Sequence, residues 1–129
     1  MSKVNNKKKV MIVDDAGFTR AMLKNIINDT KYAEVVGEAK NGNEAINLYK
    51  KLKPDMVTMD LIMPEMGGLE AIKNIMKIDK KAFIIVVSAI GQQELILEAT
   101  KIGAKDFIRK PFKKEQVMEI IERHIMATS

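Results

Sequence analysis

The stretch VMIVDD, residues 10–15, decides the fold class, because four apolar residues run directly into two adjacent carboxylates. A continuous apolar run without polar alternation is typical of a strand buried on both faces, as in parallel sheets covered by helices. The same pattern, an apolar run closed by a polar residue, recurs at MVTMD (56–60) and FIIVVS (83–88). The sequence therefore predicts several buried parallel strands with polar residues at their ends.

Amphipathic segments separate these apolar runs, with apolar residues recurring at helical spacing. We expect strands at 10–13, 32–39, 56–60, 83–88 and 106–109, and helices at about 18–27, 45–52, 69–78, 92–102 and 113–126. Gly103 follows the fourth expected helix in the position that commonly ends a helix. This alternation predicts an α/β fold with a central five-stranded parallel sheet and helices on both faces.

Length and composition exclude several classes of protein. The chain has 129 residues, no Cys and a single His, His124, so disulfide scaffolds, thiolate sites and multi-histidine metal sites are excluded. No apolar run approaches the roughly 20 residues of a membrane span, and the basic start does not lead into a signal peptide. We therefore expect one cytoplasmic domain that makes no membrane contact.

The net charge of +5 has a local origin. Lys3, Lys7, Lys8 and Lys9 supply four of these five charges, so the rest of the chain is close to neutral. We interpret residues 1–8 as a basic, flexible tail and residues 9–126 as the folded domain. Because a nucleic-acid binder normally carries its basic excess on a folded face, we expect no nucleic-acid partner.

Polar side chains close the expected strands. Asp14 and Asp15 follow the first strand, Asp60 ends the third, Ser88 ends the fourth and Lys110 follows the fifth. Ligands of open parallel sheets bind at this carboxyl edge. Three carboxylates gathered there repel one another unless a cation is present, and an all-oxygen set favours Mg²⁺, with Mn²⁺ as a substitute. A single carboxylate, Asp15 above all, could instead cap a helix.

Lys110 and Ser88 extend this chemistry to phosphate. A lysine ammonium and a hydroxyl donor, together with a metal ion, can balance a dianionic phosphoryl group. Asp60 lies nearest the centre of the predicted sheet and is therefore the natural nucleophile, which would form an aspartyl phosphate.

The ordered set of motifs resembles the response-regulator receiver domains of two-component signalling. The matching pieces are VDDAGFTR (13–20), MDLIMPEMGGLEA (59–71), VSA (87–89) and KP (110–111), and the resemblance covers residues 9 to about 126. It implies a flavodoxin-like fold with strand order 2-1-3-4-5. It also implies a protein that performs phosphorylation chemistry only on itself, rather than an enzyme with a foreign substrate.

The resemblance assigns a metal-site role to four residues. Asp60 matches the phosphoacceptor, and Asp15 and Asp60 match direct Mg²⁺ ligands. Asp14 matches the other acidic position, and the main-chain carbonyl of Ile62 matches a further ligand.

A second group of residues matches the parts of a switch. Ser88 matches the switch hydroxyl and Lys110 the phosphate-pairing lysine, whose bond to Pro111 is cis in the family. Phe107 occupies the aromatic switch position, where the family more often has Tyr. On phosphorylation, Ser88 would draw in the loop 89–91 and Phe107 would turn inward. A mechanism that needs a tyrosine hydroxyl is not available here.

The resemblance also implies an output surface and partners. The surface would comprise the fourth helix, fifth strand and fifth helix, with candidate contacts at Gln93, Lys101, Lys105, Phe107, Lys113, Glu119 and Arg123. Because about three residues follow the last expected helix, we expect protein–protein output by a monomer without an output domain. The implied partners are a sensor histidine kinase, an output adaptor or motor switch protein, and a phosphatase. Chemotaxis is the favoured pathway, and a standalone phosphorelay intermediate or regulator of a non-motility pathway is the alternative.

Two apolar residues flank the expected site: Ile62, two residues after Asp60, and Ile90, two residues after Ser88. Isoleucine cannot orient a water molecule, so we expect slow spontaneous dephosphorylation unless a phosphatase supplies a polar group.

Two other classes remain open on the residues alone. A phosphatase with an Asp nucleophile would normally carry an acid two residues later, where this chain has Ile62. A flavin carrier would need a loop rich in Ser, Thr or Gly after the first strand, where this chain has the acidic pair Asp14 and Asp15.

Overall fold

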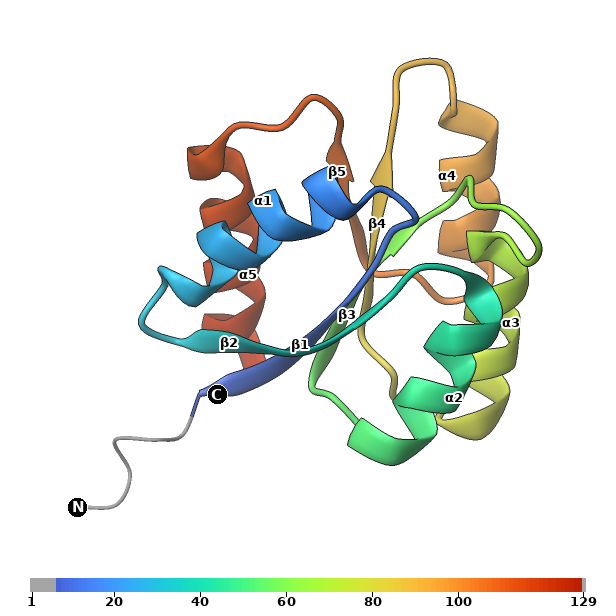
Figure 1. The fold of residues 1–129 in the computed structure, drawn as a ribbon, viewed down its shortest axis with the longest axis horizontal. Helices are drawn as coiled ribbons and strands as arrows, with labels where there is room; N and C mark the ends of the chain where they lie inside the picture. Colours follow the sequence, from blue (N-terminus) through green and yellow to red (C-terminus); the bar gives the residue numbers. More distant parts are fainter. Residues whose placement is uncertain (1–6, 129) are drawn as a thin grey trace.

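The structure, a computed structural model, describes residues 7–128, and these form strands and helices in strict alternation (Figure 1). The strands are β1 (Lys8–Val13), β2 (Ala33–Ala39), β3 (Met56–Asp60), β4 (Ile84–Ser88) and β5 (Asp106–Arg109). The helices are α1 (Gly17–Asn28), α2 (Gly42–Leu52), α3 (Gly68–Ile78), α4 (Gln93–Lys101) and α5 (Lys114–Thr128). All ten predicted elements are present, and only their end residues differ from the prediction.

The described strands form a single parallel sheet in the order β2-β1-β3-β4-β5. This is the predicted order, and it confirms the flavodoxin-like fold. The strand order reverses between β1 and β3, so the connections that leave these two strands run to opposite faces of the sheet. The carboxyl ends of β1 and β3 therefore frame the position where ligands of such sheets bind.

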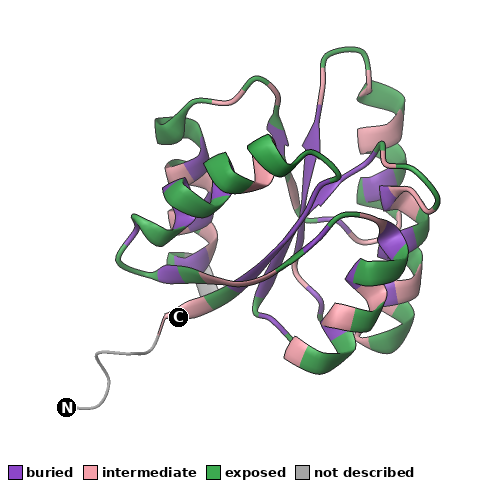
Figure 2. Cartoon of the chain, in the orientation of Figure 1, coloured by how far each residue is buried: buried purple, intermediate pink, exposed green. Residues whose placement is uncertain are grey.

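Helices cover both faces of the sheet. Helices α1 and α5 pack on one face, and α2, α3 and α4 pack on the other (Figure 1). Strands β3 and β4 are buried along their length, and β1 is buried from Val10 to Val13 (Figure 2), which is why these stretches read as apolar runs. The edge strand β2 is only partly buried, so its sequence AEVVGEA admits charged residues.

Gly68 fixes the position of α3 relative to the end of β3. A Cβ atom at this residue would overlap the Asp60 carbonyl oxygen and would lie 2.8 Å from the Cα of Leu61. The Gly68 amide donates a hydrogen bond to the Leu61 carbonyl, 3.0 Å away. Only glycine permits this close approach, so the start of α3 holds the backbone next to Asp60.

The N-terminal boundary differs slightly from the prediction. Residues 1–6 of the predicted tail lie outside the described residues, and β1 begins at Lys8, so the boundary predicted after residue 8 falls inside this strand. The Lys8 amide donates to the Tyr32 carbonyl at 2.8 Å, and the Lys9 amide donates to Asp55 Oδ2 at 2.7 Å. Within residues 7–128, no helix has the length and apolar character needed to cross a membrane.

Candidate functional site

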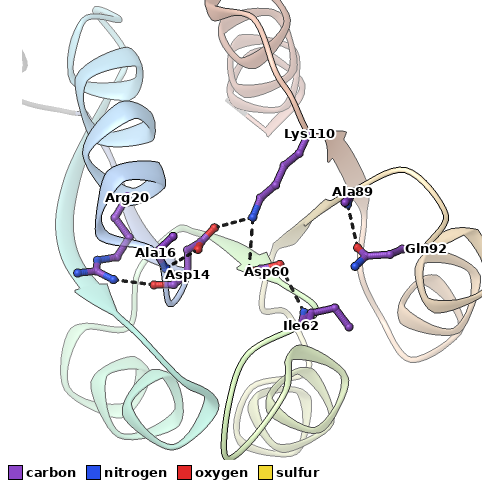
Figure 3. Close-up of polar contacts among 8 residues, drawn as sticks. All are labelled: Asp14, Ala16, Arg20, Asp60, Ile62, Ala89, Gln92 and Lys110. Atoms are coloured by element: carbon purple, nitrogen blue, oxygen red, sulfur yellow. Dashed lines mark hydrogen bonds and ion pairs between the residues drawn. The ribbon is translucent and has the colours of Figure 1, made fainter.

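The carboxyl ends of β1, β3 and β5 bring charged side chains together, as Figure 3 shows for Asp14, Asp60 and Lys110. Carboxylate oxygens of Asp14, Asp15 and Asp60 all lie within 4.8 Å of one another. The Lys110 ammonium nitrogen lies 3.1 Å from Asp14 Oδ2 and 3.5 Å from Asp60 Oδ2. Asp14 and Asp60 are buried and Asp15 is exposed, so the cluster is open to solvent on one side. The structure thus gathers these four predicted residues.

Burial and charge act strongly on Asp60. Burial and, to a lesser extent, repulsion from Asp14 raise the pKa of Asp60, attraction to Lys110 lowers it, and the net result is a pKa of about 6. Burial alone would lower the pKa of Lys110, but the negative charges of Asp60 and Asp14 outweigh this effect and raise it. Lys110 therefore stays charged, yet it does not fully offset the carboxylates.

The donor set fits a hard cation. Asp14 Oδ2 is buried and accepts no well-directed hydrogen bond from the described residues, although it forms the ion pair with Lys110. Carboxylate oxygens without histidine or thiolate are the ligands that small divalent ions prefer. This cluster could therefore hold a metal ion.

Helix capping does not explain Asp15. The N-cap residue of α1 is Ala16, and no side chain caps this helix within the described residues. The carboxylate that accepts a hydrogen bond at the start of this helix is that of Asp14, because the Ala16 amide donates to Asp14 Oδ1 at 2.9 Å. The alternative in which Asp15 is only a helix cap is therefore wrong.

Ser88 ends β4 with a buried hydroxyl that has no hydrogen-bond partner among residues 7–128. The next residue is held by a side chain that the sequence did not single out, because the Ala89 amide donates to Gln92 Oε1 at 2.8 Å (Figure 3). Ile90 is 75% exposed, and Gly91 adopts a φ of 92°, which favours glycine. The loop 89–91 is thus tied by one side-chain bond next to an unpartnered hydroxyl.

Ile62 follows Asp60 at the edge of the site. Its amide lies 3.4 Å from Asp60 Oδ1, and its side chain is exposed. The role of its carbonyl as a metal ligand stays a prediction. The peptide bond between Lys110 and Pro111 is cis, as the family resemblance implies.

Phe107 points outward from the edge strand β5. Its ring is 40% exposed, and the Arg109 guanidinium carbon lies 5.9 Å from the ring centroid. This cation–π contact was not predicted, and it stabilises the outward ring where no tyrosine hydroxyl is present. The other predicted output residues are also exposed, namely Gln93, Lys101, Lys105, Lys113, Glu119 and Arg123.

An apolar groove adjoins the site. It has a volume of about 580 Å³ and is lined mainly by Phe18, Met22, Ile90, Pro111 and Phe112, together with the side chain of Lys110. Phe18 is 78% exposed, although its place in the helical pattern suggested a role in packing. Lys110 lines this groove and also pairs with the carboxylates, so the two features are continuous.

The fold and the site define a receiver domain of a response regulator. The family model of the response regulator receiver domain matches residues 10–122, and the chain belongs to this family. The chain is 60% identical to the chemotaxis protein CheY of Thermotoga maritima over 116 residues, which cover 90% of this chain and 96% of that protein.

Solved structures agree with this assignment. The response regulator domain of Thermotoga maritima CheB superposes with a TM-score of 0.82 at 38% identity, covering 94% of this chain and 95% of that chain. A chain in the CheX–CheY–BeF3–Mg²⁺ complex from Borrelia burgdorferi superposes with a TM-score of 0.83 at 34% identity, covering 95% of this chain and 90% of that chain.

Proposed function

We propose that this protein is a phosphorylation-dependent chemotaxis response regulator in which Asp60 accepts a phosphoryl group from a CheA-like sensor histidine kinase. The observation that carries the proposal is the gathering of Asp60 with Asp14, Asp15 and Lys110 at one edge of the sheet. The identity of 60% with a chemotaxis protein CheY supports the pathway. A cytoplasmic location, expected from the sequence, stays a prediction.

The chemistry follows from the site. The bond between phosphorus and the imidazole nitrogen of the donor breaks as a bond forms from phosphorus to an Asp60 carboxylate oxygen, giving an acyl phosphate. Mg²⁺ held by Asp14, Asp15, Asp60 and the Ile62 carbonyl would supply positive charge against the entering phosphoryl group. Lys110 pairs with Asp60 at 3.5 Å and is placed to pair with a phosphoryl oxygen. The relative solved with BeF3 and Mg²⁺ supports this choice of ion.

The switch uses the unpartnered hydroxyl of Ser88. A phosphoryl oxygen on Asp60 would give this buried hydroxyl the hydrogen-bond partner that it lacks within residues 7–128. Moving toward the phosphoryl group, Ser88 draws the loop 89–91 with it, and the outward ring of Phe107 turns into the space that opens. The face formed by α4, β5 and α5 then binds an output adaptor or a motor switch protein.

The apolar groove is where the phosphodonor docks. A donor protein must bring its phosphohistidine to Asp60, and the groove lies beside Lys110, next to that carboxylate. Phe18 and Ile90 present apolar surface there, which suits an apolar patch on a donor domain. The phosphatase that we expect for this regulator would need to reach the same carboxylate.

The proposed acceptor is tested by comparing three proteins. Wild type, Asp60→Asn and the surface control Glu70→Gln are incubated with acetyl phosphate and Mg²⁺, and the intact mass of each is measured. We expect one added phosphoryl group in wild type and in the control, and none in Asp60→Asn. Modification of Asp60→Asn would place the acceptor elsewhere.

The pathway needs a separate test. Wild type loaded with beryllofluoride and Mg²⁺ is used to capture partners, with Asp60→Asn as the control. Enrichment of a motor switch protein or an output adaptor by the loaded form is expected. Preferential capture of a histidine phosphotransfer domain would instead indicate a standalone phosphorelay intermediate.

A further inference from the structure

Arg20 contacts the backbone of the acidic site, although its side chain is not part of the carboxylate cluster (Figure 3). This α1 residue donates from Nη1 to the main-chain oxygen of Asp14 at 2.8 Å, and from Nε to Glu38 Oε1 at 3.0 Å. The side chain of Arg20 is 21% exposed and that of Glu38 is 33% exposed. The guanidinium is therefore held at two points, between the end of β1 and the end of β2.

The Asp14 carbonyl belongs to the peptide unit that joins Asp14 to Asp15. Because this unit is planar, a hydrogen bond that fixes its oxygen restricts two backbone torsion angles, ψ of Asp14 and φ of Asp15. The Asp14 carboxylate has further restraints, from the Ala16 amide at 2.9 Å and from Lys110 at 3.1 Å. This peptide unit also sets the direction in which the exposed side chain of Asp15 leaves the backbone.

The charge of Arg20 is matched within the same contact. Glu38 pairs with Arg20 at 3.0 Å and also with Lys24 at 3.5 Å. An unpaired guanidinium beside a cation site would weaken cation binding by repulsion. Pairing with Glu38 reduces this repulsion while it holds the guanidinium in place for Asp14.

We infer that Arg20 is a positioning residue for the metal site: it fixes the peptide between Asp14 and Asp15 and so preorganises two of the three carboxylates. This inference rests on the proposed function, since it needs Mg²⁺ to bind there. Removal of a group that orients metal ligands without contacting the metal typically weakens metal binding by about 10- to 100-fold.

The sign of the effect distinguishes positioning from simple charge. Removal of a positive charge near a cation site should by itself tighten Mg²⁺ binding. Loss of a positioning contact should weaken it. Lys24 offers a matched control, because it lies on the same helix and pairs with the same Glu38, whereas the Asp14 carbonyl is bonded by Arg20.

The experiment compares wild type with Arg20→Gln and Lys24→Gln by NMR titration with Mg²⁺ alone. We expect roughly tenfold weaker binding for Arg20→Gln, and for Lys24→Gln an affinity within about twofold of wild type. The same spectra report whether each variant keeps the fold, and urea unfolding in EDTA reports its metal-free stability. A purely structural role would lower that stability without changing the Mg²⁺ affinity of the folded protein.

Several results would overturn the inference. Equal or tighter Mg²⁺ binding by Arg20→Gln would do so, as would an equal loss in Lys24→Gln. If Arg20→Gln does not fold, Arg20→Lys replaces it. This variant keeps the positive charge but lacks the planar guanidinium that can donate to two oxygens at once, so we expect weaker Mg²⁺ binding. Wild-type Mg²⁺ affinity in Arg20→Lys would overturn the inference. Absence of Mg²⁺ binding by wild type would instead contradict the proposed metal site itself.

Discussion

The ammonium nitrogen of Lys110 lies 3.1 Å from Oδ2 of Asp14, a residue that is only 1% exposed. In the metal-free protein this lysine is the counter-ion of a buried acid. The Asp14 carboxylate is also one of the proposed metal ligands. Lys110 and a metal ion therefore compete for the Asp14 carboxylate, and each should weaken the interaction of the other with it.

Replacement of Lys110 by Gln should lower the metal-free stability and tighten Mg²⁺ binding. Removal of one partner from a buried ion pair lowers the free energy of unfolding by about 3–5 kcal/mol. The Lys110 side chain is 26% exposed, so solvent screens this pair in part and we expect a loss of about 2 kcal/mol. Loss of a competing charge should raise Mg²⁺ affinity by roughly tenfold. Urea unfolding in EDTA and Mg²⁺ titration measure the two effects, with Lys113→Gln as a control on the same loop. Weaker Mg²⁺ binding by Lys110→Gln would contradict the competition.

Asp60→Asn should make the metal-free protein more stable above about pH 6. The pKa of Asp60 is about 6 in the folded protein against an ordinary value of 3.8, so the folded state holds this proton more tightly than the unfolded state. Stability should therefore fall as the pH rises from about 4 to about 6, and the loss then stays constant. This difference between the folded and unfolded pKa values corresponds to a loss of about 2–3 kcal/mol in the free energy of unfolding.

The measurement is urea unfolding of both proteins in EDTA across this pH range. The difference between wild type and Asp60→Asn isolates this residue from other acids, such as Asp29 and Asp79, whose pKa values are lowered and which act in the opposite direction. Equal stabilities at about pH 4 and a more stable variant at about pH 7.5 are expected. A variant that is less stable than wild type at the higher pH would contradict the prediction.

The acidic edge could be predicted from the sequence because parallel strands all end on the same side of a sheet. The sequence assigns one buried strand before Asp14, one that ends at Asp60 and one before Lys110. In a parallel sheet these three side chains must then lie at the same carboxyl edge. The contact of Arg20 could not be found in this way. It depends on how α1 packs across β1 and β2, which brings a side chain of the helix back to the carbonyl of Asp14.

The apolar groove was missed for a different reason. Residues 18–27 have a regular helical spacing of apolar residues, which predicts burial along the whole face. Within α1, however, only Leu23, Ile26 and Ile27 are buried against the sheet. Phe18 lies in the first turn of α1 and remains exposed, so the pattern alone could not separate packing from binding surface.

Phe18→Ser should impair phosphotransfer from a histidine kinase but not from acetyl phosphate. The side chain is mostly exposed, so its loss should cost little stability, whereas an anchor at a docking surface contributes about 1–2 kcal/mol or more. We therefore expect transfer from the phosphorylated kinase to slow by roughly tenfold at low protein concentration. The small phosphodonor needs no docking, so its rate should not change.

The control for this prediction is Leu97→Ser, which removes another exposed apolar side chain, on α4. Its transfer rates should match wild type with both donors. Equal kinase-dependent rates for Phe18→Ser and wild type would remove the groove from the proposed docking surface. A parallel loss with acetyl phosphate would indicate damage to the site itself.

Ile62→Asn should shorten the lifetime of the phosphorylated protein. The Ile62 amide lies 3.4 Å from Asp60 Oδ1, and the apolar side chain of Ile62 is exposed to solvent. Isoleucine offers no group that orients a water molecule for attack on phosphorus, whereas an asparagine amide can do so; we expect roughly tenfold faster decay. The decay of labelled phosphoprotein measures this, with Ile78→Asn as a control because Ile78 is similarly exposed at the far end of α3. The control should decay like wild type, and a longer lifetime for Ile62→Asn would show that the isoleucine does not shield the phosphoryl group from water.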